Sequence, residues 1–134
     1  MVEEPDSSRQ KAVVVLVTED FFSDRISTTL TALGRDAVRP RLDENLLETV
    51  LATDCLGVVV DLEDENFDAL TLLQGLRESP KTADWTFLSF CSYDDEEQMA
   101  KATALGLSVV PRSTFALNLV RKLQEFEPGE DQNS

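Results

Sequence analysis

The stretch LGVVVDLEDENFDALTLL, residues 56–73, combines two hydrophobic patterns and decides the fold. Three consecutive valines, residues 58–60, run into Asp61, and such a continuous β-branched run is typical of a strand buried on both faces of a parallel sheet. After three acidic residues the apolar spacing becomes helical from Phe67. A buried strand followed by a helix is the unit from which parallel sheets are built, so this stretch predicts an α/β protein.

The same alternation recurs along the chain. Besides residues 56–61, strands are predicted in the segments 11–20, 36–40, 85–92 and 107–110. Helices are predicted at residues 22–33, 43–52, 67–77, 94–106 and 113–126. Because parallel strands need crossover connections, the economical architecture is an open parallel sheet with helices on both faces. One domain over residues 11–126 is expected, with disordered acidic tails at residues 1–10 and 127–134.

Two helices carry specific local predictions. Asp43 is the expected N-cap of the second helix, and Ser92 with Asp95 forms the expected capping pair of the fourth. The last helix should bury one stripe, formed by Leu117, Val120, Leu123 and Phe126.

Composition excludes several function classes. The chain has 12 basic and 26 acidic residues, a net charge of −14, which argues against direct binding to a nucleic-acid backbone. It has no histidine and only two cysteines, which argues against zinc sites and histidine-based catalysis. The early apolar run AVVVLV is too short for a signal peptide or a membrane span, so neither export nor membrane insertion is expected and the predicted location is the cytoplasm.

Polar residues follow the predicted strands, where the sheet gathers them at one edge. They are Glu19 and Asp20, Asp61, Cys91 and Ser92, and Arg112. This constellation, over about residues 11–126, resembles the receiver domain of response regulators, in which an acidic pair, a phosphorylated Asp, a Thr or Ser and a Lys end successive strands. The resemblance implies the flavodoxin-like (βα)5 fold with strand order 2-1-3-4-5.

Carried over position by position, the resemblance makes Asp61 the phosphoacceptor. It makes Asp20 the direct ligand of Mg²⁺, Glu19 its water-mediated companion, and Glu63 the residue whose backbone carbonyl completes the metal shell. A cation held by several oxygens offsets the charge of an attacking carboxylate and of the incoming phosphoryl group. Mg²⁺ is the only cofactor that the resemblance implies, and the only chemistry it implies is autophosphorylation.

Several positions depart from the family pattern. Arg112 stands where the family has Lys, one residue early, and Cys91 stands where the family has Thr or Ser, with Ser92 as a replacement only after a one-residue shift. The fifth strand has Val109 and Val110 and lacks the aromatic ring that many receivers move on activation. The loop after Asp61 also adds negative charge beside the site.

These departures favour an atypical, stand-alone receiver domain in bacterial signal transduction that acts through protein–protein interaction, with phosphorylation at Asp61 impaired or absent. The alternative is a working Mg²⁺-dependent phosphoacceptor in a two-component phosphorelay, with a histidine kinase as partner. A monomer or weak homodimer is expected in either case. The resemblance places the partner-binding surface at the fifth strand and the last helix, at Val110, Ser113, Thr114, Asn118 and Arg121.

Overall fold

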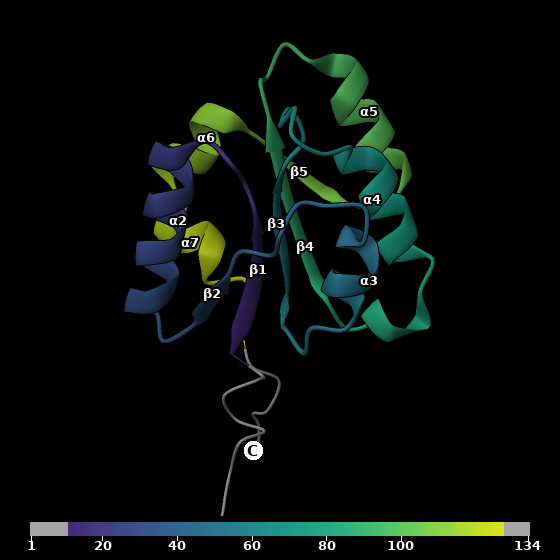
Figure 1. The fold of residues 1–134 in the computed structure, drawn as a ribbon. Helices are drawn as coiled ribbons and strands as arrows, with labels where there is room; N and C mark the ends of the chain where they lie inside the picture. The colour runs from purple at the N-terminus through teal and green to yellow at the C-terminus, as the bar shows by residue number, and fades with distance from the viewer. Residues whose placement is uncertain (1–10, 128–134) are drawn as a thin grey trace, which may run out of the picture.

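The computed structural model describes residues 11–127. Its core is a five-stranded parallel sheet with the order β2-β1-β3-β4-β5, as predicted (Figure 1). The strands are β1 (Ala12–Leu16), β2 (Asp36–Val38), β3 (Gly57–Asp61), β4 (Thr86–Cys91) and β5 (Ser108–Pro111). The helices are α2 (Asp20–Ala32), α3 (Leu46–Leu51), α4 (Ala69–Arg77), α5 (Glu96–Ala104), α6 (Arg112–Leu117) and α7 (Leu119–Leu123), with a short 3₁₀ turn, η1 (Pro80–Thr82).

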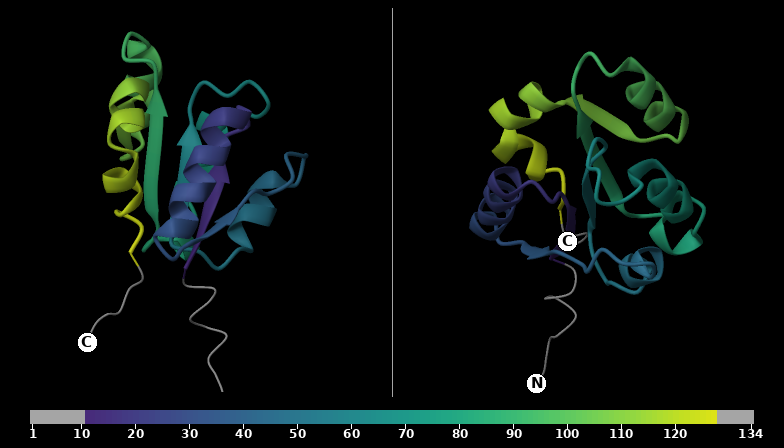
Figure 2. Two further views of the ribbon diagram at one scale, coloured as in Figure 1. Left: turned by 90° about the vertical axis from the view of Figure 1, so that its left-hand side faces the viewer. Right: turned by 45° about the horizontal axis from the view of Figure 1, so that its top comes forward.

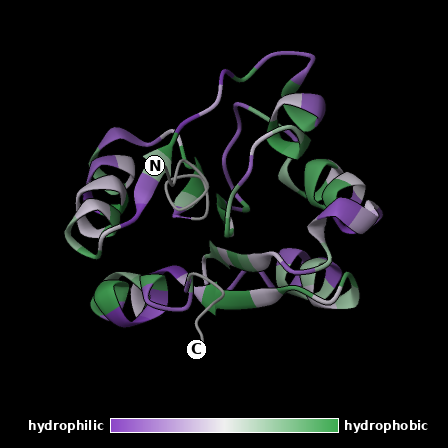
Figure 3. Ribbon diagram, turned by 90° about the horizontal axis from the view of Figure 1, so that it is seen from below, coloured by the Kyte–Doolittle hydropathy of each residue, from purple (hydrophilic) through white to green (hydrophobic). Residues whose placement is uncertain are grey.

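Helices cover both faces of the sheet. Figures 1 and 2 show α2, α6 and α7 on one face, and α3, α4 and α5 on the other. Each side has its own apolar layer, because alternate valines of β1 and β3 point in opposite directions: Val14 and Val58 belong to one layer, Val13 and Val59 to the other. Hydrophobic residues dominate the strands, while the helices carry both kinds of residue (Figure 3). The doubly wound arrangement predicted from the sequence is confirmed.

The register brings the ends of the central strands level. Asp61, the last residue of β3, pairs with Phe90 of β4, and Cys91 pairs with Pro111 of β5. A close approach inside the sheet depends on Gly57, whose φ is 156° and whose missing side chain leaves room for the backbone of Thr86. The carboxyl ends of β3, β4 and β5 therefore form one edge.

Two predicted helix starts need correction. Helix α3 begins at Leu46 with Asn45 as its N-cap, not at Asp43. The Asp43 side chain instead accepts a hydrogen bond from the Asn45 amide at 2.9 Å. This bond to the amide two residues later closes a local Asx turn before the helix begins. In α5 the cap is Asp95 alone, whose carboxylate accepts from the Gln98 amide at 3.2 Å.

The prediction of a buried stripe on the last helix is wrong for Leu117 and Val120 and right for Leu123 and Phe126. The segment breaks at Asn118 into α6 and α7, and Leu117 and Val120 are 85% and 52% exposed. Phe115 takes the inward position instead, because its ring stacks on Phe90 with 4.5 Å between centroids. Phe115, Leu119, Leu123 and Phe126 form the buried stripe.

Across residues 11–127, no helix has the length and apolar character needed to cross a membrane. The tail predicted at residues 1–10 lies outside the described residues, as does the tail predicted at residues 127–134 apart from Glu127.

Candidate functional site at the carboxyl ends of the strands

Three elements bring the central side chains of the site together. Asp61 ends β3, Ser92 follows β4, and Arg112 begins α6 directly after Pro111. Pro111 fixes the turn into α6, with φ at −58°, so that the Arg112 side chain starts from the edge of the sheet beside Asp61. The sequence prediction placed these three residues at one edge, and the structure brings them together.

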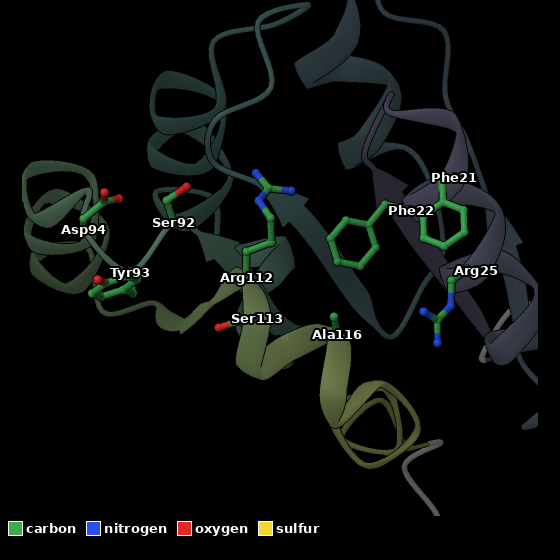
Figure 4. A pocket seen from close by; sticks show the side chains of 9 residues that line it. All are labelled: Phe21, Phe22, Arg25, Ser92, Tyr93, Asp94, Arg112, Ser113 and Ala116. Atoms are coloured by element: carbon green, nitrogen blue, oxygen red, sulfur yellow. The ribbon is translucent and has the colours of Figure 1, made fainter.

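The guanidinium of Arg112 bridges two carboxylates. Its Nη2 donates to Asp61 Oδ1 at 2.9 Å and to Glu63 Oε1 at 2.9 Å. Figure 4 shows the Arg112 side chain extending from the start of α6 toward this edge. The guanidinium also lies 5.0 Å from the ring centroid of Phe90 and 5.7 Å from that of Phe22. The same cation is therefore held both by charge-assisted hydrogen bonds and by aromatic rings.

Glu63 ties the bridge to the β4–α5 turn. Its Oε1 accepts from the backbone amide and from the hydroxyl of Ser92, both at 3.0 Å. Burial raises the pKa of the Glu63 carboxyl, but the donors on Arg112 and Ser92 outweigh burial, and the pKa is lowered overall. Glu63 thus enters the site through its charged side chain, whereas the sequence prediction used only its backbone carbonyl.

Asp61 is the most deeply buried member of the site, with 7% of its side chain exposed. Burial raises its pKa above the usual value, and the opposing contributions of the Glu63 amide and of Arg112 only partly offset burial. The Glu63 amide donates to Asp61 Oδ1 at 2.9 Å, so the oxygen that receives Arg112 also closes a local turn. Asp61 Oδ1 is therefore fully engaged within the protein.

In the acidic loop after β3, the Asp64 carboxylate is held by hydrogen bonds within the protein. Asp64 accepts from the backbone amide of Thr18 at 2.7 Å and from its hydroxyl, and the Asn66 side chain donates to the same hydroxyl at 2.7 Å. Burial raises the pKa of Asp64, but hydrogen bonds from Asn66 and Thr18 outweigh it and lower the pKa overall. Asp64 clamps the loop to the end of β1, a role that the sequence analysis missed and that only the Asp-x-Asn turn pattern hinted at.

The predicted acidic pair after β1 serves other purposes. Glu19 is the N-cap of α2, where its carboxylate accepts from the Phe22 amide at 2.9 Å. Asp20 is exposed and lines a separate hollow of about 160 Å³ with Thr18 and Arg39.

As placed, the residues do not fit a magnesium ion. Within the described residues, no three His, Cys, Asp or Glu side chains form a group that could hold a metal ion. The position next to Asp61 is filled by the Arg112 cation, and the predicted side-chain ligands Glu19, Asp20 and Asp61 form no such group. A metal would have to displace the guanidinium first.

Cys91 does not reach the site. Its side chain is fully buried in the layer beneath α4 and α5, and burial raises the pKa of its thiol to about 11. The prediction that Cys91 contributes to catalysis finds no support in this placement, because a residue at the end of a strand points to one face only. Ser92, one position later, supplies the hydroxyl at the edge.

The predicted partner surface is only partly exposed. Ser113, Thr114 and Arg121 are exposed, and Asn118 is half-buried with its amide bonded to the Thr114 carbonyl at 3.0 Å. Val110 is 6% exposed and packs in the apolar layer beneath α2 and α7. Val110 therefore has to be removed from the predicted surface, because β5 directs its side chain into the core.

Comparisons with known proteins agree with the fold. No protein-family model and no curated protein sequence matches the chain. Among solved structures, a putative response regulator from Chloroflexus aurantiacus has a TM-score of 0.73 at 15% identity, covering 87% of this chain and 97% of that one. The chemotaxis response regulator CheY4 of Vibrio cholerae has a TM-score of 0.70 at 13% identity, covering 88% of this chain and 98% of that one.

A third neighbour is the receiver domain of a sensor histidine kinase from Pseudomonas aeruginosa, with a TM-score of 0.71 at 10% identity over 87% of this chain and 97% of that one. That domain has a magnesium ion coordinated in its active-site cleft. At these identities the likeness establishes the receiver fold of this chain.

Proposed function

We propose that this chain is an atypical receiver domain, a cytoplasmic signalling module that acts by binding protein partners and is not phosphorylated at Asp61. The observation that carries the proposal is the bridge from Arg112 Nη2 to Asp61 and Glu63, at 2.9 Å to each carboxylate. The bridge supplies a permanent positive charge where a phosphoacceptor needs an exchangeable cation.

Two features of the site oppose phosphorylation. First, one of the two Asp61 carboxylate oxygens, Oδ1, already accepts from Arg112 and from the Glu63 amide. Each hydrogen bond to a charged group contributes about 1.5–3 kcal/mol, and breaking it leaves a buried carboxylate without its partner. Second, no described cluster of acids stands ready to bring in a metal with the phosphodonor.

A receiver domain that is not phosphorylated can still act by binding other proteins. The exposed surface of α6 and α7, with Ser113, Thr114 and Arg121, borders the large exposed apolar side chains Leu117 and Val120. Exposed apolar side chains beside polar ones are typical of contact surfaces. A histidine kinase or another signalling protein is the expected partner, and neither Mg²⁺ nor a phosphoryl group is required for its capture.

Phosphorylation is tested with acetyl phosphate and Mg²⁺ by intact-protein mass spectrometry. The wild type should gain no phosphoryl group, and Arg112→Lys, which restores the residue type expected at this position, is the matched comparison. A stoichiometric adduct on the wild type that disappears in Asp61→Asn would overturn the proposal in favour of a working phosphoacceptor.

Partner binding is tested by affinity capture from the native host with tagged wild type, Asp61→Asn and Arg121→Glu. A specific protein recovered equally by the wild type and Asp61→Asn, and lost with Arg121→Glu, is the expected pattern. Recovery that depends on Asp61 and ignores Arg121 would contradict the proposal.

A further inference from the structure

A groove lies beside the acidic site, between the start of α2, the start of α6 and the turn after β4. Its volume is about 510 Å³, within the range of about 300–1,000 Å³ that is typical of small-molecule sites. Figure 4 shows the side chains that line it, with Phe21, Phe22 and Arg25 coming from α2 and Ala116 from α6. The groove opens at the carboxyl ends of the strands, where open α/β sheets bind their ligands.

Aromatic rings form much of its wall. Phe21 is 66% exposed and Tyr93 is 75% exposed, and they lie at opposite sides of the groove with the buried Phe22 and Arg112 between them (Figure 4). Neither exposed ring has a ring partner within the described residues, although Phe22 contacts both Phe90 and Phe115. The exposed face of such a ring can take up a planar aromatic ligand by stacking.

Two cations line the groove in a chain whose net charge is −14, and one of them, Arg112, already shares its charge with Asp61 and Glu63. Two guanidinium groups, of Arg25 and Arg112, line the groove, against a single carboxylate, that of Asp94. Arg25 is exposed and lies 5.7 Å from the ring centroid of Phe21, and no carboxylate in residues 11–127 pairs with it. Among the described residues, Arg112 is the one cation that both lines the groove and contacts Asp61 and Glu63.

Arg112 also retains donors for a ligand. Both of its side-chain hydrogen bonds leave from Nη2, so its Nε and Nη1 groups donate to no acceptor within residues 11–127. The hydroxyl of Ser113, on the exposed first turn of α6, is likewise without a partner in that range. Planar guanidinium donors match carboxylate and phosphate oxygens in geometry and in charge.

We infer that this groove binds a small planar aromatic molecule carrying one acidic group, with the ring against Phe21 and the acid at Arg25 and Arg112. The inference goes beyond the proposed partner binding and requires neither a partner protein nor phosphorylation. Because Arg112 reaches both the groove and the carboxylates, a bound acid should also alter the surroundings of Glu63 and Ser92.

The test is a titration of the full chain with anilinonaphthalene sulfonate, an aromatic anion, followed by fluorescence and by amide NMR. Saturable binding is expected, with amide shifts at Phe21, Tyr93 and Ala116 that extend to Glu63. The uncharged phenylnaphthylamine should bind at least about tenfold more weakly, since the ion pair with the guanidinium is lost.

Two matched arginine variants locate the site. Arg25→Gln should weaken binding of the sulfonate about tenfold and leave binding of the uncharged probe unchanged. Arg39→Gln is the control, because Arg39 is also exposed but pairs with Asp24 and lies outside the groove. Phe21→Ser, at an exposed position that should not affect folding, should weaken both probes.

Absence of saturation, shifts that do not include the groove, or equal effects of Arg25→Gln and Arg39→Gln would each overturn the inference. Failure of partner capture would refute the proposed protein-binding role and leave this titration unaffected.

Discussion

Replacing Arg112 by methionine should lower the free energy of unfolding by about 2 kcal/mol at neutral pH. Exposed ion pairs contribute about 0–1 kcal/mol, whereas removing one partner of a buried pair costs about 3–5 kcal/mol. This bridge lies between the two limits, because the side chains of Asp61, Glu63 and Arg112 are 7%, 27% and 33% exposed. Methionine keeps the apolar stem of the side chain, so the loss reports mainly on the charge.

The effect should depend on pH in a defined direction. In the wild type, burial keeps the pKa of Asp61 raised, so the stability it contributes is present below its unfolded-state pKa and is lost as pH rises through the folded value. Glu63 has a lowered pKa, and its contribution is present above its unfolded-state pKa and is lost as pH falls through the folded value. Without the guanidinium both pKa values should rise. The gap between wild type and variant should therefore be largest at neutral pH and shrink as the pH falls through the raised pKa values of the two carboxyls in the variant.

Urea denaturation at a series of pH values measures this gap, with Arg121→Met as the matched control, since Arg121 is an exposed arginine that should change stability by less than about 0.5 kcal/mol. Adding Asp61→Asn to Arg112→Met should recover part of the loss, because the buried charge left without a partner is removed. If Arg112→Met behaves like Arg121→Met at neutral pH, the reasoning about the bridge is refuted.

Three further predictions concern the scaffold around the site. Asp68→Ala removes the cap of α4, whose carboxylate accepts from the Thr71 amide, and should cost about 1 kcal/mol in urea denaturation. Gly57→Ala places a methyl group against the backbone of Thr86 and should cost more than about 2 kcal/mol in the same assay. The thiol of Cys91 is fully buried, and burial raises its pKa to about 11, so iodoacetamide at mildly alkaline pH should label Cys91 in the folded protein only as fast as the protein unfolds.

Each of these predictions has its own comparison. Asp68→Asn can still cap the helix, so equal losses in the Asn and Ala variants would contradict the capping role. Gly75→Ala meets only the flexible side chain of Leu47 and should change stability little; the same loss at Gly57 and Gly75 would show that the contact with Thr86 is unimportant. Labelling of Cys91 at the rate of the urea-unfolded chain would contradict its burial.

The sheet and the edge of the site could be predicted because they follow from local patterns. Continuous valine runs identify buried strands, and the parallel arrangement brings Asp61 and Arg112 to one edge. The hydrogen-bond partner of each side chain at that edge could not be predicted. Glu19 turns to cap α2, and Glu63 turns its carboxylate inward, because neighbours from other strands offer donors that sequence spacing does not reveal.

The last helix shows the same limit. A stripe through Leu117 and a stripe through Phe115 both fit helical spacing, and the choice between them depends on the ring of Phe90 across the layer. Cys91 and Ser92 present a similar choice. Adjacent residues at the end of a strand point to opposite faces, so a one-residue shift decides which of them reaches the site.

The most direct measurement of the central claim, that Arg112 holds Asp61 in place of an exchangeable cation, is an amide NMR titration with Mg²⁺ followed by beryllofluoride. The account predicts a folded spectrum in which the amides of Asp61, Glu63 and Ser92 show no saturable shift at either step. Saturable shifts at Asp20 and Asp61 with Mg²⁺, spreading to β5 with beryllofluoride, would contradict the account and identify a working phosphorylation site.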